Sequence, residues 1–172
     1  MPAVYTIGYG NRSIDDFISR LQRHAIAYLL DVRSIPYSRF NPDFIKARLA
    51  DLLAAHDIRY VFMGQALGGK PDNPALYDAE GKLDYGKVRA SPVYQEGLAR
   101  VQNACTQNLR VALMCAELHP EQCHRSMLIA PSLEALGIEV LHINAEGLLI
   151  PHADLHAPGQ LLLFDDNDGN MD

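Results

Sequence analysis

The sequence predicts a single α/β domain with three layers, α/β/α, around a mostly parallel, Rossmann-like sheet of about five strands. Short apolar runs alternate along the chain with stretches whose apolar residues recur at helical spacing, and such alternation is typical of βαβ units. The chain of 172 residues, 48% hydrophobic and 21% charged, has the length and composition of one globular domain. Right-handed crossovers between parallel strands then place the loops that follow the strands at one edge of the sheet.

The expected strands are the apolar runs at residues 3–7, 26–30, 59–63, 109–114 and 138–143. Residues 64–90 are rich in Gly, Pro, Asp and Asn and read as one long irregular connection, a kind of segment that is usually functional. The helices between the strands are marked by N-caps, by proline at the first helical position and by a terminal glycine. These signals are Ser13 with Asp16, Asn41-Pro42, Ser91-Pro92 and Gly137.

Residues 1–152 are expected to form the domain, and residues 153–172 an arm with an acidic tail. No apolar run approaches the ~20 residues of a membrane helix, and the first residues lack a secretory signal pattern. Three cysteines, an odd number, argue against a disulfide framework and favour a reducing compartment, so we expect a cytoplasmic protein. Four of the six net negative charges belong to tail aspartates, which leaves the rest of the chain near −2 and keeps nucleic acid open as a partner.

The most informative segment is 115–125, which carries two thiols, a carboxylate, two imidazoles and a guanidinium directly after an apolar run. In open α/β sheets ligands bind at the carboxyl ends of strands. Cys123, just before an expected helix and near Arg125, is a candidate nucleophile or redox-sensitive group, and Cys115 is a second. The alternative for both is a structural buried cysteine. Glu117 or Asp31 is the candidate general acid or base.

Cations that follow several expected strands converge on the same edge. Arginine forks and glycine-rich loops there suit a phosphate or another oxyanion, whereas the alternative is a set of structural ion pairs with Asp31 and Glu117. The candidate phosphate-binding residues are Arg12, Arg33, Arg39, Lys70, His124 and Arg125.

Two further patterns bear on the ligand. Cys115, His119, Cys123 and His124 are zinc-ligand types, but their spacing matches no closed zinc site, so we expect no metal and no cofactor. Residues 35–40 interleave Tyr and Phe with Arg, which can stack on bases while holding phosphates. The alternative for that stretch is a loop anchored by its aromatic residues.

Four motifs in order resemble one bacterial and archaeal family, the domain of unknown function number 488. The resemblance spans residues 3 to about 150 and implies an α/β domain with the motif residues in one cleft, but it implies no reaction. The motifs are Gly8-Tyr-Gly-Asn-Arg12-Ser, Leu30-Asp31-Val-Arg33-Ser-Ile-Pro36-Tyr-Ser-Arg39-Phe, Leu67-Gly-Gly69 and Cys115-Ala-Glu117 with Cys123-His-Arg125.

The tail segment 160–164, Gln-Leu-Leu-Leu-Phe, resembles the pentapeptide by which bacterial replication and repair proteins dock on the DNA sliding clamp. Gln160 would enter a small polar pocket, while Leu161, Leu163 and Phe164 would anchor in an apolar groove. The alternative is an edge strand packed on the domain.

These observations lead to three hypotheses. The first is an enzyme that acts on nucleic acid or a nucleotide through the Arg-rich site, with Cys and Glu at the sheet edge, possible recruitment by the sliding clamp and a role in DNA repair. The second is a cysteine-dependent hydrolase or transferase for a small phosphorylated or sulfur-bearing molecule. The third is a non-catalytic module that binds a nucleotide or nucleic acid.

Overall fold

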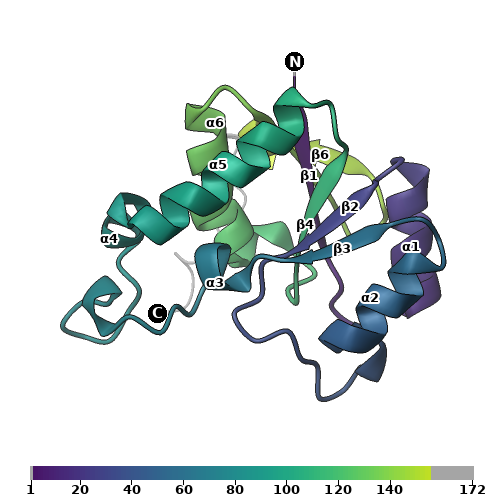
Figure 1. Ribbon diagram of the computed structural model, residues 1–172, viewed down its shortest axis with the longest axis horizontal. Coiled ribbons are helices and arrows are strands. Elements are labelled where there is room, and N and C mark those ends of the chain that lie inside the picture. Colours follow the sequence, from purple (N-terminus) through teal and green to yellow (C-terminus); the bar gives the residue numbers. More distant parts are fainter. Residues whose placement is uncertain (1, 156–172) are drawn as a thin grey trace, which may run out of the picture.

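The computed structural model describes residues 2–155, which form a six-stranded sheet flanked by helices (Figure 1). The strand order is β3-β2-β4-β1-β5-β6, and the first five strands run parallel. The sixth strand pairs antiparallel with β5. The strands are β1 (Ala3–Gly8), β2 (Tyr28–Asp31), β3 (Arg59–Phe62), β4 (Val111–Cys115), β5 (Glu139–Ile143) and β6 (Leu149–Pro151).

The register of the sheet brings the predicted motifs to one edge. Gly8, at the end of β1, lies opposite Cys115 at the end of β4. On the other side of β4, Met114 lies opposite Asp31, the last residue of β2. Because β4 lies between β1 and β2, the loops that follow these three strands meet at the middle of the carboxyl edge.

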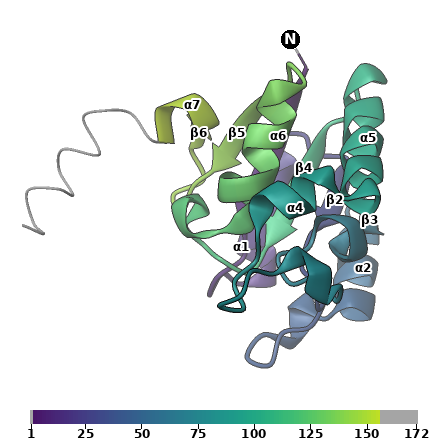
Figure 2. The same cartoon turned by 90° about the vertical axis from the view of Figure 1, so that its left-hand side faces the viewer.

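Helices cover both faces of the sheet and bury one apolar cluster on each. In Figure 2, α5 and α6 lie on the viewer's side of the sheet, where they pack on one cluster; α1 and α2 pack on the other. Alternate strand residues enter opposite clusters: Val4 joins the first, whereas Tyr5 joins the second. The α-helices are α1 (Ile14–Arg23), α2 (Lys46–Ala54), α3 (Gly64–Leu67), α4 (Tyr85–Ala90), α5 (Pro92–Thr106), α6 (Ala130–Ala135) and α7 (His152–Leu155). The shorter turns are η1 (Pro42–Phe44), η2 (Pro74–Leu76), η3 (Pro120–Gln122) and the π-helical η4 (Arg125–Ile129).

Several sequence expectations change in detail. The segment 64–90 is not wholly irregular, since it contains α3, η2 and α4. The helix expected after Asn41 starts as a 3₁₀ turn and restarts at Lys46, because Ile45 between them is extended at φ −71° and ψ 136°. The sheet gains β6, and α7 follows it with Leu155 buried.

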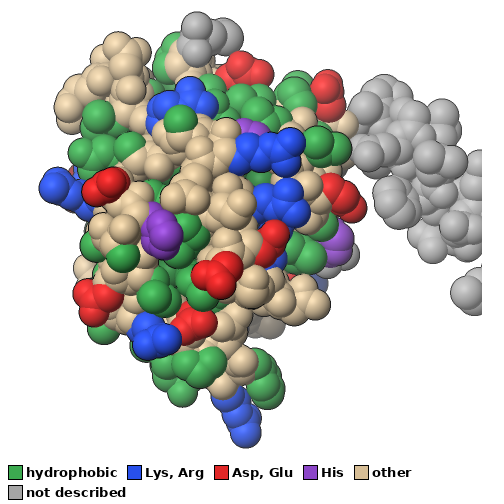
Figure 3. All heavy atoms as spheres, turned by 90° about the vertical axis from the view of Figure 1, so that its right-hand side faces the viewer, with side chains coloured by type: hydrophobic (Ala, Val, Ile, Leu, Met, Phe, Trp, Pro, Cys, Tyr) green, Lys and Arg blue, Asp and Glu red, His purple; other side chains and the backbone are tan. Residues whose placement is uncertain are grey.

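The surface over the side of α1 and α2 carries both signs of charge. Figure 3 shows Lys and Arg side chains interspersed with Asp and Glu on this face. Within residues 2–155, no helix has both the length and the apolar character to cross a membrane.

Candidate active site at the carboxyl edge

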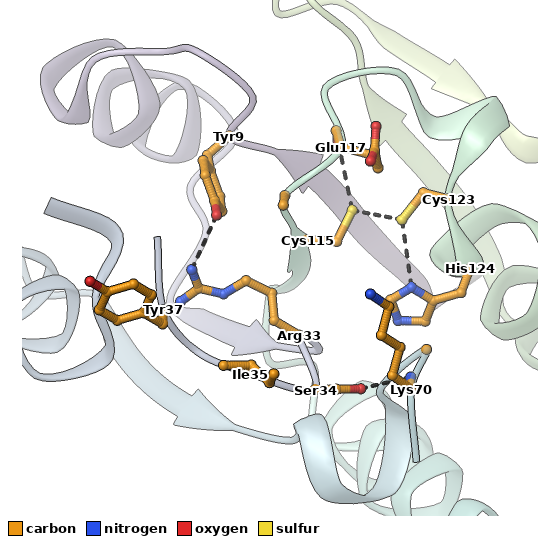
Figure 4. A pocket seen from close by; sticks show the side chains of 12 residues that line it. Tyr9, Arg33, Ser34, Ile35, Tyr37, Lys70, Cys115, Glu117, Cys123 and His124 are labelled. Atoms are coloured by element: carbon orange, nitrogen blue, oxygen red, sulfur yellow. Dashed lines mark hydrogen bonds between the residues drawn. The ribbon is translucent and has the colours of Figure 1, made fainter. Parts of the chain in front are cut away.

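A cavity of about 350 Å³ opens at the carboxyl edge of the sheet, beyond the ends of β1, β2 and β4. Figure 4 shows its side chains arranged around two cysteine sulfurs, with Arg33 and the loop of residues 34–37 facing them. The sequence motifs that were expected to converge therefore do so. The cavity is lined by Tyr9, Arg33, Ser34, Ile35, Tyr37, Gly69, Lys70, Cys115, Ala116, Glu117, Cys123 and His124.

Cys115 and Cys123 form a close thiol pair in the cavity wall. Their sulfur atoms are 2.7 Å apart, both residues are buried, and neither forms a disulfide. Burial and the hydrogen bond to Cys123 raise the pKa of Cys115 well above its ordinary value. The hydrogen bond from Cys115 has the opposite effect on its neighbour and is the largest cause that lowers the pKa of Cys123 to about 4. These effects favour the thiolate form of Cys123 over that of Cys115.

Two neighbours, His124 and Arg125, favour the thiolate form of Cys123. The Nδ1 atom of His124 is 3.7 Å from the Cys123 sulfur, and its Nε2 atom lies 3.2 Å from the backbone oxygen of Val32. Because a carbonyl oxygen only accepts hydrogen bonds, Nε2 carries a proton and Nδ1 is the atom that exchanges a proton with the thiol. Hydrogen bonding and charge from His124, and charge from Arg125, further lower the pKa of Cys123.

Arg125 holds the loop after β4 from inside the protein. Its side chain is fully buried and donates to the Thr6 hydroxyl at 2.7 Å and to the backbone oxygens of Glu117 and Leu118 at 2.9 and 3.2 Å. None of the ion pairs found among the described residues involves Arg125, and its charge helps to lower the pKa of Cys123. Gly8 makes the close approach possible, because a Cβ atom there would lie 1.7 Å from the Glu117 oxygen.

A wide helical turn begins directly after the reactive pair. Residues Arg125–Ile129 are π-helical, and the backbone N–H of Ala130 donates to the oxygen of Arg125. Pro131 follows and has no N–H to offer Met127, which accounts for the irregular turn. Such turns occur frequently at functional sites. The carbonyl of Cys123 accepts from the next N–H groups of this helix, so the predicted placement of Cys123 at a helix start is confirmed.

Asp31 lies beneath the cavity, outside its lining. The carboxylate is fully buried and accepts both guanidinium hydrogen bonds of Arg33, at 2.9 and 2.8 Å, and the hydroxyl of Tyr60. Burial tends to lower the pKa of Arg33, but hydrogen bonding and charge from Asp31 raise it overall. Burial and Asp31 also raise the pKa of Tyr60. We assign Asp31 to positioning Arg33, whose Nη1 points at the hydroxyl of Tyr9 at 3.4 Å.

The other predicted anion-binding residues separate into two groups. Arg12 is buried and spends its donors on Asp16 and on the backbone oxygens of Gly8 and Asn144. Like Arg125, it acts within the fold, but its acidic partner is Asp16 and not Asp31 or Glu117. Lys70, an exposed cavity residue, and the half-buried His124 belong to the second group.

Glu117 and Arg39 occupy more open positions. Glu117 is exposed and lines the cavity through the loop that Arg125 holds. Arg39 is also exposed and lies with its guanidinium carbon 5.6 Å from the centre of the Phe40 ring; it does not line the cavity. The predicted roles of these two residues in catalysis and phosphate binding stay predictions.

Sequence reasoning did not assign a role to several residues of the site. Tyr9 and Ser34 line the cavity; both stand inside quoted motifs, which was the available signal. His142 and His152 form a buried chain with Thr6: Thr6 Oγ1 lies 2.6 Å from His142 Nδ1, and His142 Nε2 lies 3.0 Å from His152 Nδ1. Thr6 connects this chain to Arg125, a link between distant residues that no local pattern predicts.

Two further expectations concern metal binding and the tail. Within residues 2–155, no three His, Cys, Asp or Glu side chains lie close enough together to hold a metal ion. The clamp-binding candidate 160–164 lies outside the described residues.

Comparison with known protein families gives one match: the model of the family "Domain of unknown function DUF488" covers residues 13–130. The matched region includes β2 to η4 and therefore both cysteines. Comparisons with curated proteins and with solved structures give no match.

Proposed function

The chain belongs to the DUF488 family of domains of unknown function, whose name specifies no reaction, and from the site we propose a cysteine-dependent hydrolase or transferase with Cys123 as the nucleophile. The observation that carries the proposal is the position of the Cys123 sulfur in a cavity wall, with the Cys115 sulfur at 2.7 Å and the Nδ1 atom of His124 at 3.7 Å; these neighbours lower the pKa of Cys123. A thiolate beside an imidazole is the arrangement that activates cysteine for covalent catalysis.

The cavity supports a small substrate. Its volume of about 350 Å³ lies within the range of small-molecule sites. Ile35 and Tyr37 provide apolar walls, Lys70 provides a positive charge, and Glu117 provides a carboxylate above the sulfurs (Figure 4). In this proposal the Cys123 thiolate attacks the electrophilic atom and displaces the leaving group, which takes a proton from His124. Water or a second substrate then gives a proton back to His124 and cleaves the Cys123 adduct, while Lys70 attracts an acidic group of the substrate. Free thiols persist in a reducing compartment, so the proposed site of action is the cytoplasm.

The test combines thiol reactivity with turnover. Alkylation by iodoacetamide should label Cys123 with a pH midpoint near its pKa of about 4, far below the midpoint of an ordinary thiol. Cys123→Ser should remove this labelling and any turnover of nitrophenyl phosphate or nitrophenyl acetate. Cys105→Ser is the matched control, because Cys105 is also a buried cysteine but lies on α5 away from the cavity lining. Labelling of Cys123 only at the pH of an ordinary thiol would exclude the proposal.

One observation favours a second candidate, an enzyme that acts on nucleic acid or a nucleotide. The side chains of Ile35 and Tyr37, which line the cavity, are 72% and 57% exposed, and that of Phe40 further along the same loop is 91% exposed; Arg39 lies over the Phe40 ring. Exposed aromatic side chains interleaved with arginine are a platform on which bases stack. The apolar loop would then bind the bases of the substrate.

Recruitment by the DNA sliding clamp, and with it a role in DNA repair, is carried by the sequence 160–164 alone. Calorimetric titration of the purified clamp with the full chain, and with a chain truncated after Gly159, tests it. Micromolar binding that is lost on truncation is expected, and equal heats for both chains would remove the proposal.

The proposed architecture is a three-layer, Rossmann-like α/β/α fold. The apolar clusters on both faces of the sheet support it. The strand order differs from the order 3-2-1-4-5 of a dinucleotide-binding sheet, because β4 lies between β2 and β1.

A further inference from the structure

We infer that Cys123 and Cys115 act as an attacking and a resolving thiol that exchange with small-molecule disulfides, so that the substrate class is a low-molecular-weight disulfide and the products are thiols. The inference rests on the proposed function of Cys123 as a nucleophile and names its substrate. It adds a role for Cys115 that hydrolysis or simple group transfer does not need.

The geometry of the pair carries the inference. The two sulfurs belong to residues eight positions apart and lie 2.7 Å from each other in the same cavity wall. Cys115 is fixed by the pairing of β4 with β1, and Cys123 by its backbone hydrogen bonds to η3 and to the following helix. A disulfide bond of about 2.0 Å needs only a small approach from this separation. A thiol placed this near a nucleophilic sulfur can attack any mixed disulfide that forms there.

The exchange proceeds in two balanced steps. The Cys123 thiolate attacks one sulfur of the substrate disulfide; the substrate S–S bond breaks, a Cys123–substrate disulfide forms and one substrate thiolate leaves. Cys115 then loses its proton to solvent and attacks the Cys123 sulfur, which forms the Cys115–Cys123 bond and releases the second substrate thiolate. Two electrons pass from the cysteines to the substrate. A small dithiol returns them by the same chemistry.

The first step prepares the second. Burial is the largest cause of the raised pKa of Cys115, and the hydrogen bond and the charge of Cys123 add two further effects in the same direction. Once Cys123 is in a neutral mixed disulfide, both of these effects disappear, whereas the charge of Arg125 still lowers the pKa of Cys115. Formation of the mixed disulfide therefore makes Cys115 easier to ionise, at the moment when its attack is required.

The chemistry also restricts the substrate. Because the Cys123 thiolate is strongly stabilised, the reduced pair is favoured, and a substrate must be a disulfide whose leaving thiol is acidic. For the same reason, a dithiol readily regenerates the reduced pair. The apolar walls at Ile35 and Tyr37 and the charge of Lys70 suit an aromatic or acidic substituent. A neighbouring cavity of about 390 Å³ shares Ser34, Ile35 and Lys70 with this one and offers room for the second half of the molecule.

The experiment uses dithiobis(nitrobenzoate), an aromatic acidic disulfide, on the full chain with Cys105→Ser, so that only the pair can react. Stopped-flow absorbance is expected to show two nitrothiobenzoate ions released per chain, and mass spectrometry a product lighter by two hydrogens with Cys115 and Cys123 linked. Adding Cys115→Ser should halve the release and leave a stable adduct on Cys123. Adding Cys123→Ser instead should slow the reaction about tenfold or more at about pH 6.

The outcomes separate this inference from the proposed function. A stable adduct on Cys123 with Cys115 present would overturn the resolving role and leave the nucleophile intact. An absence of any adduct on Cys123 after Cys115→Ser, with the fold verified by circular dichroism, would overturn both. Cys115→Ala is the second variant if the serine hydroxyl is not tolerated in this buried position, and it should trap the same adduct.

Discussion

The two loops that frame the cavity are built in opposite ways. The loop after β4 is held from within: buried Arg125 donates to its backbone oxygens, and Gly10 donates to the oxygen of Ala116. The loop after β2 places its large apolar side chains outward, with Phe40 91% exposed and Ile35 72% exposed. One loop therefore has its geometry fixed by buried polar contacts, and the other presents surface.

This difference assigns the two loops different tasks. A nucleophile needs its neighbours held in place, since its pKa depends on short contacts to groups such as Cys115. An exposed apolar loop contributes little to the stability of the isolated protein and can gain contacts only when a ligand covers it. The comparison places the chemistry on the loop after β4 and ligand recognition on the loop after β2, and substitutions in each loop test that division.

The largest effect is expected from Arg125→Met, compared with the matched change Arg39→Met on the other loop. Loss of the buried guanidinium leaves Thr6 and two backbone oxygens without their donor and the Cys123 thiolate without its cation. We expect a loss of about 3–5 kcal/mol in the free energy of unfolding. Arg39→Met, at an exposed position, should change it by about 0.5 kcal/mol or less. Urea denaturation measures both, and similar values for the two would remove the distinction between the loops.

The next largest effect on stability is expected from Gly8→Ala. The added methyl would meet the Glu117 backbone oxygen at 1.7 Å and the Arg125 guanidinium at 2.9 Å, so the strand or the loop has to move. We expect a cost of about 3 kcal/mol, at the upper end for overpacking, and slower alkylation of Cys123 because its surroundings are displaced. Gly81→Ala is a control for loss of a glycine outside the site: no atom meets its Cβ, although its φ of +80° adds backbone strain. Thermal unfolding measures the stability of both variants, and iodoacetamide kinetics measure the reactivity of Cys123 in both. Unchanged reactivity in Gly8→Ala would show that the close packing there is not needed by the thiolate.

The convergence of the motifs at one sheet edge was predictable, because parallel strands followed by loops leave few alternatives. Cys123 at a helix start was predictable from the apolar pattern that follows it. The engagement of Arg12 and Arg125 by backbone oxygens was not, since a sequence shows charges but not which carbonyls they reach. The buried contact of Thr6 with His142 crosses 136 positions, and no spacing rule applies at that separation.

The short elements also could not be predicted from the pattern of apolar residues. The strand β6, which pairs with β5, has three residues and is too short to show an alternation of apolar and polar residues. The order of strands, with β4 between β1 and β2, depends on which crossovers skip a neighbour, and the periodicity of a chain carries no such information.

Cys115→Ala should change the chemistry more than the stability. Its thiol is the largest cause of the lowered pKa of Cys123, so the pKa should rise from about 4 toward an ordinary value. A thiol whose pKa is lower in the folded than in the unfolded protein stabilises the fold fully at a pH above its unfolded pKa. This stabilisation is lost as the pH falls toward the folded pKa. The wild-type protein should lose this stability between about pH 9 and pH 4, and the variant over a narrower interval. Thiolate absorbance measured against pH gives the shift in the pKa of Cys123. Identical titration curves for the wild-type protein and Cys115→Ala would show that Cys115 does not stabilise the Cys123 thiolate.

The smallest effect on stability, and the clearest test of the second loop, is expected from Tyr37→Ala and Phe40→Ala. Both side chains are mostly exposed, so each change should alter the free energy of unfolding by about 0.5 kcal/mol or less and leave the pH profile of Cys123 unchanged. Stacking on a base contributes about 1–3 kcal/mol, so each change should weaken the binding of a fluorescent single-stranded oligonucleotide about fivefold or more if the substrate contains bases. Leu136→Ala removes a partly exposed apolar side chain elsewhere and should not affect binding. Anisotropy titrations that are the same for all four proteins, or that show no binding, would exclude base stacking on this loop and leave small molecules as the ligands of the cavity.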